Sequence, residues 1–374
     1  MFNLSPEEKL ILLLSRLNPP AEVAESVRKI TGGEVPVDYR RFLTLSRLNL
    51  VSPLLYLNLK KIGGVPGDVL DELKKAYLVT IRNNVLHGRE TMKLIGLLEK
   101  AGVEAVPLKG SLASDMIFGD PGLYPTGDVD LLVRSQSMEK AKEALLGAGY
   151  RESYGENEAD FLASSYHLIF HDGGYSVELH WNLVKWAFQA PPDFWWEGAL
   201  KSRYEGTEIT LLSPERYLLY TIFHLFTHRF SPLKFLVLVS GLITKYRMEM
   251  DWDKLLFCAK SLRMKRLALF TLRLSHDLLG ADIPEPLLKR KVPGYPLLRK
   301  VVLSGFFREA TRSYVRLALF TTLLDTPWDT TRVLLRRIFP PLSEVRLRYG
   351  LSGVSKKVYA YYLLNPVLMI IRKR

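Results

Sequence analysis

The chain has 374 residues, of which 48% are hydrophobic and 24% are charged, a composition typical of globular proteins of two or three domains. Its single cysteine, Cys258, excludes a disulfide framework and a cysteine-rich zinc site. The net charge is +13, and residues 260–374 hold 23 Lys and Arg against 7 Asp and Glu, whereas residues 1–259 hold 29 against 32. This asymmetry indicates a polyanionic partner, nucleic acid or an acidic membrane surface, although a solvated basic surface would give the same count.

Residues 1–100 are predicted to be helical. Ser5 is followed three residues later by Glu8, which is a capping-box pattern at the start of a helix. The segment 65–102 carries apolar residues at helical spacing and stops at a glycine. Because the N-terminus has acidic residues where a signal peptide is basic, we expect no signal peptide and a cytoplasmic location.

Residues 101–212 have the sequence pattern of a small α/β unit, because they contain short apolar runs instead of long amphipathic segments. A hairpin turn is predicted at Asp172-Gly173-Gly174. The predicted elements are strands at 103–108 and 128–133, an amphipathic helix at 137–150, paired strands within 166–183, and a further strand at 206–212.

From Ser213 onward the pattern is helical again, with a break at Pro340-Pro341. The longest uncharged run, Val358–Ile371, is too short to span a bilayer and is interrupted by Asn365-Pro366, so we expect no transmembrane segment. The expected fold class is therefore α+β. A small mixed-sheet core at residues 101–212 is flanked by an N-terminal helical region at 1–100 and a C-terminal basic helical domain at 213–374.

The most unusual feature of the predicted sheet is an Asp-x-Asp motif at a buried strand. Side chains two residues apart point the same way, so Asp128 and Asp130 share one face while Val129 faces the core. Neighbouring carboxylates repel each other unless a cation lies between them, and Mg²⁺ prefers oxygen ligands. Two such ions about 3.5–4 Å apart can hold the attacking and leaving oxygens of a phosphoryl transfer.

A third carboxylate is available in the segment 175–181. If Val177 and Leu179 pack inward, then Glu178 and His180 share the opposite face of that strand. Glu178 on a strand next to the Asp-x-Asp motif would complete a two-metal site. His180 could contact substrate or orient a ligand, or it could be an ordinary strand residue.

The turn Lys109-Gly110-Ser111 closes the strand before the motif, where a helix is expected to begin. Backbone N–H groups exposed at such a turn bind phosphate, and the glycine permits close approach. The serine hydroxyl can donate a hydrogen bond, and the lysine adds positive charge. A Gly-Ser turn by itself is usually only a turn, so its position next to the carboxylates carries this interpretation.

The chain resembles the DNA polymerase β-type nucleotidyltransferase superfamily in the order of its elements: strand, Gly-Ser turn, short helix, Asp-x-Asp strand, helix, hairpin and Glu. Within this superfamily it resembles the mostly uncharacterised bacterial and archaeal family that has a Lys-Gly before the Asp-x-Asp strand. The resemblance covers roughly residues 97–350 and is strongest at 107–133 and 175–183. The stretch before the motif, Tyr124-Pro125-Thr126, lacks the arginine often found there, which leaves the nucleotide preference open.

What the resemblance implies is transfer of a nucleoside monophosphate from an NTP to an acceptor hydroxyl, with release of pyrophosphate. The resemblance assigns the triphosphate to Gly110 and Ser111, with Lys109 and His180 as further candidates. It assigns two Mg²⁺ ions, or Mn²⁺, to Asp128, Asp130 and Glu178, which would also be the catalytic residues.

The basic C-terminal third suggests the acceptor. Arg336, Arg337, Arg346 and Arg348 lie among tyrosines, a combination that suits RNA because charge holds the backbone and rings stack on bases. Our first choice is therefore RNA, in particular a tRNA end, and such an activity would be toxin-like. The apolar part of residues 355–374 could instead lie on an anionic membrane or dock on the protein's own core.

Two alternatives to this function stay open: a small-molecule or protein acceptor, and an inactive nucleotidyltransferase fold that serves as a binding module.

His224 and His228 are four residues apart on a predicted helix, and we favour ordinary helix residues over cleft residues. For Trp195 and Trp196, packing is favoured over base stacking.

Overall fold

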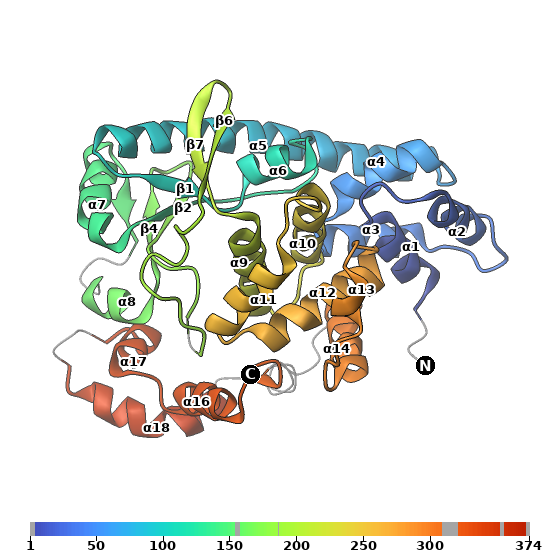
Figure 1. The fold of residues 1–374 in the computed structure, drawn as a ribbon. Coiled ribbons are helices and arrows are strands. Elements are labelled where there is room, and N and C mark those ends of the chain that lie inside the picture. The colour runs from blue at the N-terminus through green and yellow to red at the C-terminus, as the bar shows by residue number, and fades with distance from the viewer. Residues whose placement is uncertain (1–3, 154–157, 186, 309–320, 352–354, 372–374) are drawn as a thin grey trace.

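The computed structural model describes residues 4–153, 158–185, 187–308, 321–351 and 355–371 (Figure 1). The N-terminal region is helical, as predicted, and Ser5 forms the expected capping box, because the Glu8 N–H donates to its hydroxyl and its own N–H donates to the Glu8 carboxylate. The helices of this region are α1 (Pro6–Leu14), α2 (Ala21–Thr31), α3 (Tyr39–Leu48), α4 (Ser52–Ile62) and α5 (Gly67–Lys100).

The central sheet is mixed, which confirms the predicted α+β class. Its strands are β1 (Ala105–Pro107), β2 (Val129–Val133), β3 (Arg151–Glu152), β4 (His167–His171) and β5 (Ser176–His180), in the order β1-β2-β5-β4-β3. β2 and β5 run parallel, and the other neighbours are antiparallel. Between the strands come α6 (Ser111–Phe118), η1 (Ser135–Ser137), α7 (Met138–Gly147) and α8 (Glu158–Ser164). Strands β6 (Leu200–Tyr204) and β7 (Thr207–Leu211) form a separate hairpin, so the strand expected at 206–212 is present.

One face of the central sheet is apolar and is covered by helices. Val129, Leu131, Val177 and Leu179 are buried in one cluster with residues of α5 and α7. Figure 1 shows α5 running along the upper edge of the molecule, from the sheet to the N-terminal helices. The opposite face of β2 and β5 therefore stays available for polar side chains, as the alternation of residues in both strands predicts.

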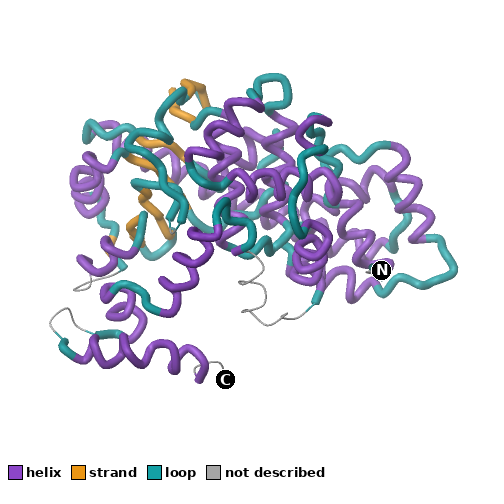
Figure 2. The backbone as a smooth tube through the Cα atoms, turned by 60° about the horizontal axis from the view of Figure 1, so that its bottom comes forward, coloured by secondary structure: helices purple, strands orange, loops and turns teal. Residues whose placement is uncertain are grey.

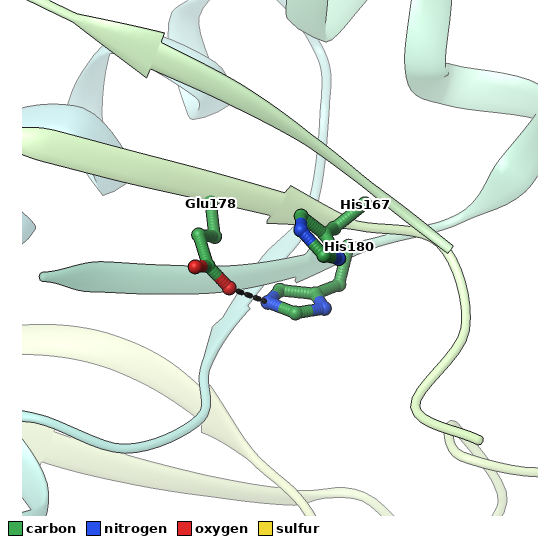
Figure 3. A group of neighbouring side chains, drawn as sticks. All are labelled: His167, Glu178 and His180. Carbon is green, nitrogen blue, oxygen red and sulfur yellow. Dashed lines mark ion pairs between the residues drawn. The ribbon is translucent and has the colours of Figure 1, made fainter. Parts of the chain in front are cut away.

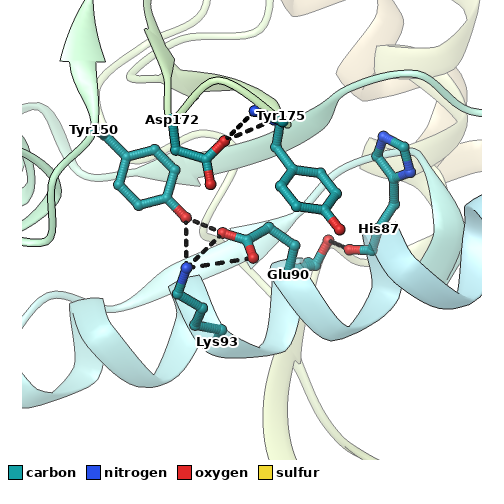
Figure 4. Close-up of polar contacts among 8 residues, drawn as sticks. His87, Glu90, Lys93, Tyr150, Asp172 and Tyr175 are labelled. Atoms are coloured by element: carbon teal, nitrogen blue, oxygen red, sulfur yellow. Dashed lines mark hydrogen bonds and ion pairs between the residues drawn. The ribbon is translucent and has the colours of Figure 1, made fainter.

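The turn of the β4–β5 hairpin packs against α5 beside a cluster of polar contacts (Figure 4). Asp172 accepts hydrogen bonds from the backbone N–H groups of Gly174 at 2.9 Å and Tyr175 at 2.7 Å, which confirms its role in the turn. The Tyr175 ring packs edge-on against His87 of α5, with 5.2 Å between centroids. Beside it, Glu90 of α5 binds a tyrosine hydroxyl and a lysine. The strand that carries Glu178 is thus held in place at its turn.

The C-terminal region is helical, as expected. Its helices are α9 (Pro214–Thr227), α10 (Lys234–Lys245), α11 (Trp252–Ser261), α12 (Lys265–Leu279), α13 (Glu285–Leu288), α14 (Tyr295–Phe307), α16 (Pro327–Ile338), α17 (Leu342–Tyr349) and α18 (Lys357–Ile371). Figure 2 shows the strands gathered at one side of a largely helical molecule. Leu10 and Phe42 of the N-terminal helices are buried in the same cluster as Phe223 and Phe270 of the C-terminal helices. The domain boundaries at residues 100 and 212 stay a prediction.

Helices α16, α17 and α18 lie together beside α8, at the lower edge of Figure 1. The buried Asn365 of α18 accepts a hydrogen bond from Arg348 at 2.8 Å and donates one to the Ile338 carbonyl at 2.7 Å, which ties the three helices to one another. Leu363 and Leu364 of α18 are exposed. No helix of the described residues is long and apolar enough to cross a membrane. Part of the apolar stretch at 367–371 lies outside the described side chains.

Candidate metal and nucleotide site

The pairing of β2 with β5 brings the three acidic residues together. In the parallel register Asp130 lies directly opposite Glu178, and Asp128 comes just before the first residue of β2. The structure gathers one carboxylate oxygen from each of the three within 4.8 Å of the others. Asp130 is buried, whereas Asp128 and Glu178 are half-buried and line a cavity. An all-oxygen donor set of this size fits a hard divalent cation such as Mg²⁺ or Mn²⁺.

Lys109 lies between the two aspartates. Its ammonium nitrogen is 3.1 Å from Asp128 Oδ2 and 3.0 Å from Asp130 Oδ2. Burial alone would lower the pKa of Lys109, but the charges of Asp130 and Asp128 outweigh it and raise the pKa above its usual value. The ammonium therefore supplies part of the positive charge that the paired carboxylates require. Lys109 was expected to contact nucleotide, and the structure places it against the carboxylates.

His180 and His167 lie beside Glu178 (Figure 3). His180 Nε2 lies 3.2 Å from Asp130 Oδ1 and 3.3 Å from Glu178 Oε2. Burial would raise the pKa of Glu178, but the hydrogen bond and charge of His180, followed by the charge of Lys109, lower it to about 2. His167 lies opposite His180 in the β4–β5 register, and burial lowers its pKa to about 4. Sequence reasoning missed His167, although counting back from the hairpin turn pairs it with His180.

Gly110 and Ser111 stand at the N-terminus of α6. Gly110 has φ 96° and ψ −150°, a conformation that favours glycine, and a Cβ there would lie 3.4 Å from the Asp128 carbonyl oxygen. Gly110 lines the cavity, whereas Ser111 is not among the described lining residues. The Ser111 hydroxyl is buried close to Gly88 of α5. The helix N-terminus thus reaches the site through its backbone at Gly110.

The cavity beside the carboxylates has a volume of about 730 Å³. Its wall is formed largely by cationic and aromatic side chains. The cationic lining residues are Lys109, Lys185, Arg229, Lys234, Arg336, Arg337 and Arg348. The aromatic ones include Tyr124, Tyr166, Tyr220, Phe223, Phe226 and Phe235. Positive charge of this density around three carboxylates suits a polyphosphate that arrives with divalent cations.

Three of the four C-terminal arginines proposed for RNA, Arg336, Arg337 and Arg348, line this same cavity. They are more than 200 residues away from the Gly-Ser turn in the sequence, but the fold brings α16 and α17 to the cavity that Gly110 lines. Arg346 has another role in the structure, since its guanidinium binds both oxygens of Asp160 at 2.6 Å and fastens α17 to α8.

His224 and His228 also line the cavity, which corrects our preference for ordinary helix residues. Their rings pack against each other with 4.5 Å between centroids, and both pack against Phe235. Trp195 is buried in the core and donates a hydrogen bond to Asn182 at 2.9 Å, so packing is confirmed for this residue.

Comparison with known families agrees with this geometry. A family model described as uncharacterised nucleotidyltransferase matches residues 36–280, and the chain belongs to this family. No curated protein and no solved structure matches the chain. The matched range contains the sheet, the three carboxylates and α9 to α12. Helices α16 and α17, which bring Arg336, Arg337 and Arg348 to the cavity, lie outside it.

Proposed function

We propose that the protein transfers a nucleoside monophosphate from an NTP to an acceptor hydroxyl and releases pyrophosphate. The observation that carries this proposal is the convergence of Asp128, Asp130 and Glu178 on one face of the sheet, at a cationic cavity, in a chain of this family. Electrostatic stabilisation and positioning supply most of the catalysis in such reactions.

In this proposal Asp128, Asp130 and Glu178 hold two Mg²⁺ ions, or Mn²⁺. Such ions neutralise charge on the phosphates and make the acceptor hydroxyl a better nucleophile. The backbone at Gly110 approaches the phosphates, and the cationic side chains of the cavity wall neutralise their remaining charge. Buried Asp130 also holds His180 at 3.2 Å, so its orientation is fixed before substrate arrives.

The charges of the cavity fall into two neighbourhoods. Burial, followed by the charge of Lys109, lowers the pKa of Lys234 to about 8. Burial also lowers the pKa of Lys185. The charges with the next largest effects on this pKa are those of Glu344 and Arg336, followed by that of Glu178. We assign the triphosphate to the Lys109 and Lys234 end, next to Gly110. The acceptor then enters at the Lys185 and Arg336 end, next to Glu178.

The acceptor favoured by these charges is an RNA end, with a tRNA end as the first choice. A cavity of about 730 Å³ is of the size that holds a small ligand, so only the terminal nucleotides of an RNA would enter it. The same volume favours a small phosphorylated molecule as the second candidate acceptor. In both cases Arg336 and Arg348 would bind the phosphate groups of the acceptor.

The test is to incubate the protein with Mg²⁺, each NTP labelled in its α-phosphate, and either total RNA or small hydroxyl acceptors. We expect the α-label to move to an acceptor. In a parallel reaction with NTP labelled in its γ-phosphate, the label should appear only in pyrophosphate. EDTA, Asp128→Asn or Asp130→Asn should reduce transfer at least a thousandfold, and the exposed Asp253→Asn on α11 should not.

Glu178→Gln should likewise cut turnover by orders of magnitude. Glu208→Gln, which alters an exposed glutamate on β7, serves as its control. Full activity of the Asp128→Asn or Glu178→Gln protein, or activity in EDTA, would refute the proposed site.

A further inference from the structure

A second group of candidate metal ligands lies beside the three carboxylates. His167, Glu178 and His180 each offer one ligand atom, and the three atoms lie within 4.8 Å of one another. Figure 3 shows the three side chains gathered at the ends of β4 and β5. All three residues line the cavity, so an ion could reach them from solvent. Glu178 belongs to this group and also to the group with Asp128 and Asp130.

The strand register explains why these side chains meet. In the antiparallel β4–β5 pair, His167 lies opposite His180 and Ile169 lies opposite Glu178. Residues two apart on one strand share a face, so His167 faces the same side of the sheet as Glu178 and His180. The two imidazole rings have 5.0 Å between their centroids. This face therefore has oxygen ligands on β2 and nitrogen ligands on β4 and β5.

The distances fit a shared cation. Metal–ligand bonds of about 2.1 Å place neighbouring ligand atoms of an octahedral ion about 3.0 Å apart and opposite ones about 4.2 Å apart. His180 Nε2 lies 3.2 Å from Asp130 Oδ1 and 3.3 Å from Glu178 Oε2. One N–H group cannot point straight at two separate carboxylates. An ion bound by this nitrogen and the Glu178 oxygen would also have the ligand atom of His167 within 4.8 Å of both, and its binding would release the ring proton to solvent.

We propose that His167, Glu178 and His180 form a second cation position that takes a borderline transition-metal ion, of the Zn²⁺ and Co²⁺ class, in preference to Mg²⁺. Imidazole nitrogen suits such ions, whereas Mg²⁺ prefers oxygen and gives up its water reluctantly. Glu178 then belongs to a mixed centre, with the two hard ions of the proposed function on its Asp128 and Asp130 side. The role of this ion in catalysis rests on the proposed nucleotidyl transfer, but its binding does not.

The experiment uses the metal-free full chain with Co²⁺ as the probe, in a large excess of Mg²⁺. We expect one equivalent of Co²⁺ to stay bound, with a visible absorption spectrum and hyperfine-shifted imidazole N–H signals in the proton NMR spectrum. His167→Ala should weaken Co²⁺ binding at least tenfold. His171→Ala, which removes an exposed histidine from the same strand, is the matched control and should bind as the wild type does.

Asp128→Asn separates this inference from the proposed function. It alters the all-oxygen group alone, so it should retain the Co²⁺ spectrum while it loses transfer. Thermal unfolding of each variant checks that it is folded, and His167→Asn replaces His167→Ala if the latter is not. Displacement of Co²⁺ by equimolar Mg²⁺, or wild-type Co²⁺ affinity in a folded His167 variant, would overturn the inference. Intact Co²⁺ binding in a wild-type protein that transfers no label would refute only the proposed function.

Discussion

Lys109 holds the two aspartates together through its ammonium group. Its ammonium lies within hydrogen-bonding distance of both Asp128 and Asp130, at 3.1 Å and 3.0 Å, and its side chain is 12% exposed. A cation that enters between the aspartates must compete with this ammonium for the same oxygens. Lys109 therefore stabilises the paired carboxylates and sets how strongly the site attracts a divalent ion.

Replacement of this lysine should expose that competition. In Lys109→Met the carboxylates repel each other without compensation, so the melting temperature in EDTA should fall by several degrees. Mg²⁺ should restore more of the stability than it adds to the wild type, and its apparent affinity should rise about tenfold, because a competing positive charge is gone. Thermal unfolding over a range of Mg²⁺ concentrations measures both.

Lys142→Met is the matched control for this prediction. Lys142 has a side chain that is 16% exposed and is ion-paired to Glu152 at 2.8 Å, so its loss should also destabilise the fold. Mg²⁺ should not restore that loss. An equal Mg²⁺ response in the Lys109→Met protein and the wild type would show that the ammonium does not compete with the ion.

The residues of the site could be predicted from the sequence only as far as alternation along a strand allows. Alternation correctly placed Asp130 and Glu178 on the polar side and Leu179 on the apolar side. The position of Lys109 depends on the antiparallel pairing of β1 with β2, in which the Leu108 N–H donates to the Asp130 carbonyl at 3.1 Å. Pairing between strands far apart in the chain cannot be deduced from alternation, because it depends on tertiary packing.

At the scale of elements, α16 and α17 form one wall of the cavity. Arg336 is bound to Glu344 at 2.8 Å and Arg348 to Asn365 at 2.8 Å, so these side chains are oriented by neighbouring helices. The ion pair of Arg346 with Asp160 fixes α17 against α8. The wall thus contains arginines that line the cavity and one that holds the wall in place.

Substitution of the cavity arginines tests the RNA acceptor. The triple change Arg336→Gln, Arg337→Gln and Arg348→Gln should weaken RNA binding. Each lost phosphate contact lowers the log–log salt slope by about 0.7 for single strands, so the slope should flatten by about 2. NTP affinity should fall less than RNA affinity, because the triphosphate is assigned to the Lys109 and Lys234 end of the same cavity. Filter binding at several salt concentrations measures the slope.

A matched control removes the same charge elsewhere in the basic third. Lys289, Arg290 and Lys291 are exposed and do not line the cavity, and their replacement with Gln should leave the slope nearly unchanged. Equal flattening by both triple changes would indicate diffuse surface binding. No RNA binding by the wild type would favour a small-molecule acceptor, and binding to vesicles that requires anionic lipid would favour the membrane alternative.

The elements that the sequence did not predict are short and polar. Strand β6, Leu200–Tyr204, has no fully buried side chain, so it depends on pairing with β7. Helix α8 has seven residues and is supported by its contacts with α17. The long helix α5 was predicted well, because its apolar periodicity repeats over many turns.

At the scale of the whole molecule, α5 belongs to two cores. Val69 and Leu73 near its start are buried with the N-terminal and C-terminal helices, whereas Leu94 and Leu98 near its end are buried beneath the sheet. A cut at residue 100 would remove Leu94 and Leu98 from the sheet that they cover. The regions expected from the sequence as separate domains are therefore linked through one rigid helix.

We accordingly expect the full chain to unfold in a single calorimetric transition. The isolated segment 101–212 should not fold, because loss of α5 uncovers the apolar side of its sheet. Circular dichroism and calorimetry of the segment and of the full chain provide the measurement. Two resolved transitions, or a cooperatively folded segment 101–212, would establish independent domains instead.

The direct opposition of Asp130 and Glu178 across two parallel strands has a consequence for how this gene can change length. One added codon within β5 would shift every following residue to the other side of the sheet and turn Glu178 or His180 toward the apolar core. The same codon added at Gly173-Gly174 would lengthen an exposed turn and leave the pairing of both strands as it is. Insertions in descendants of this gene should therefore accumulate at the turn and be purged from the strand.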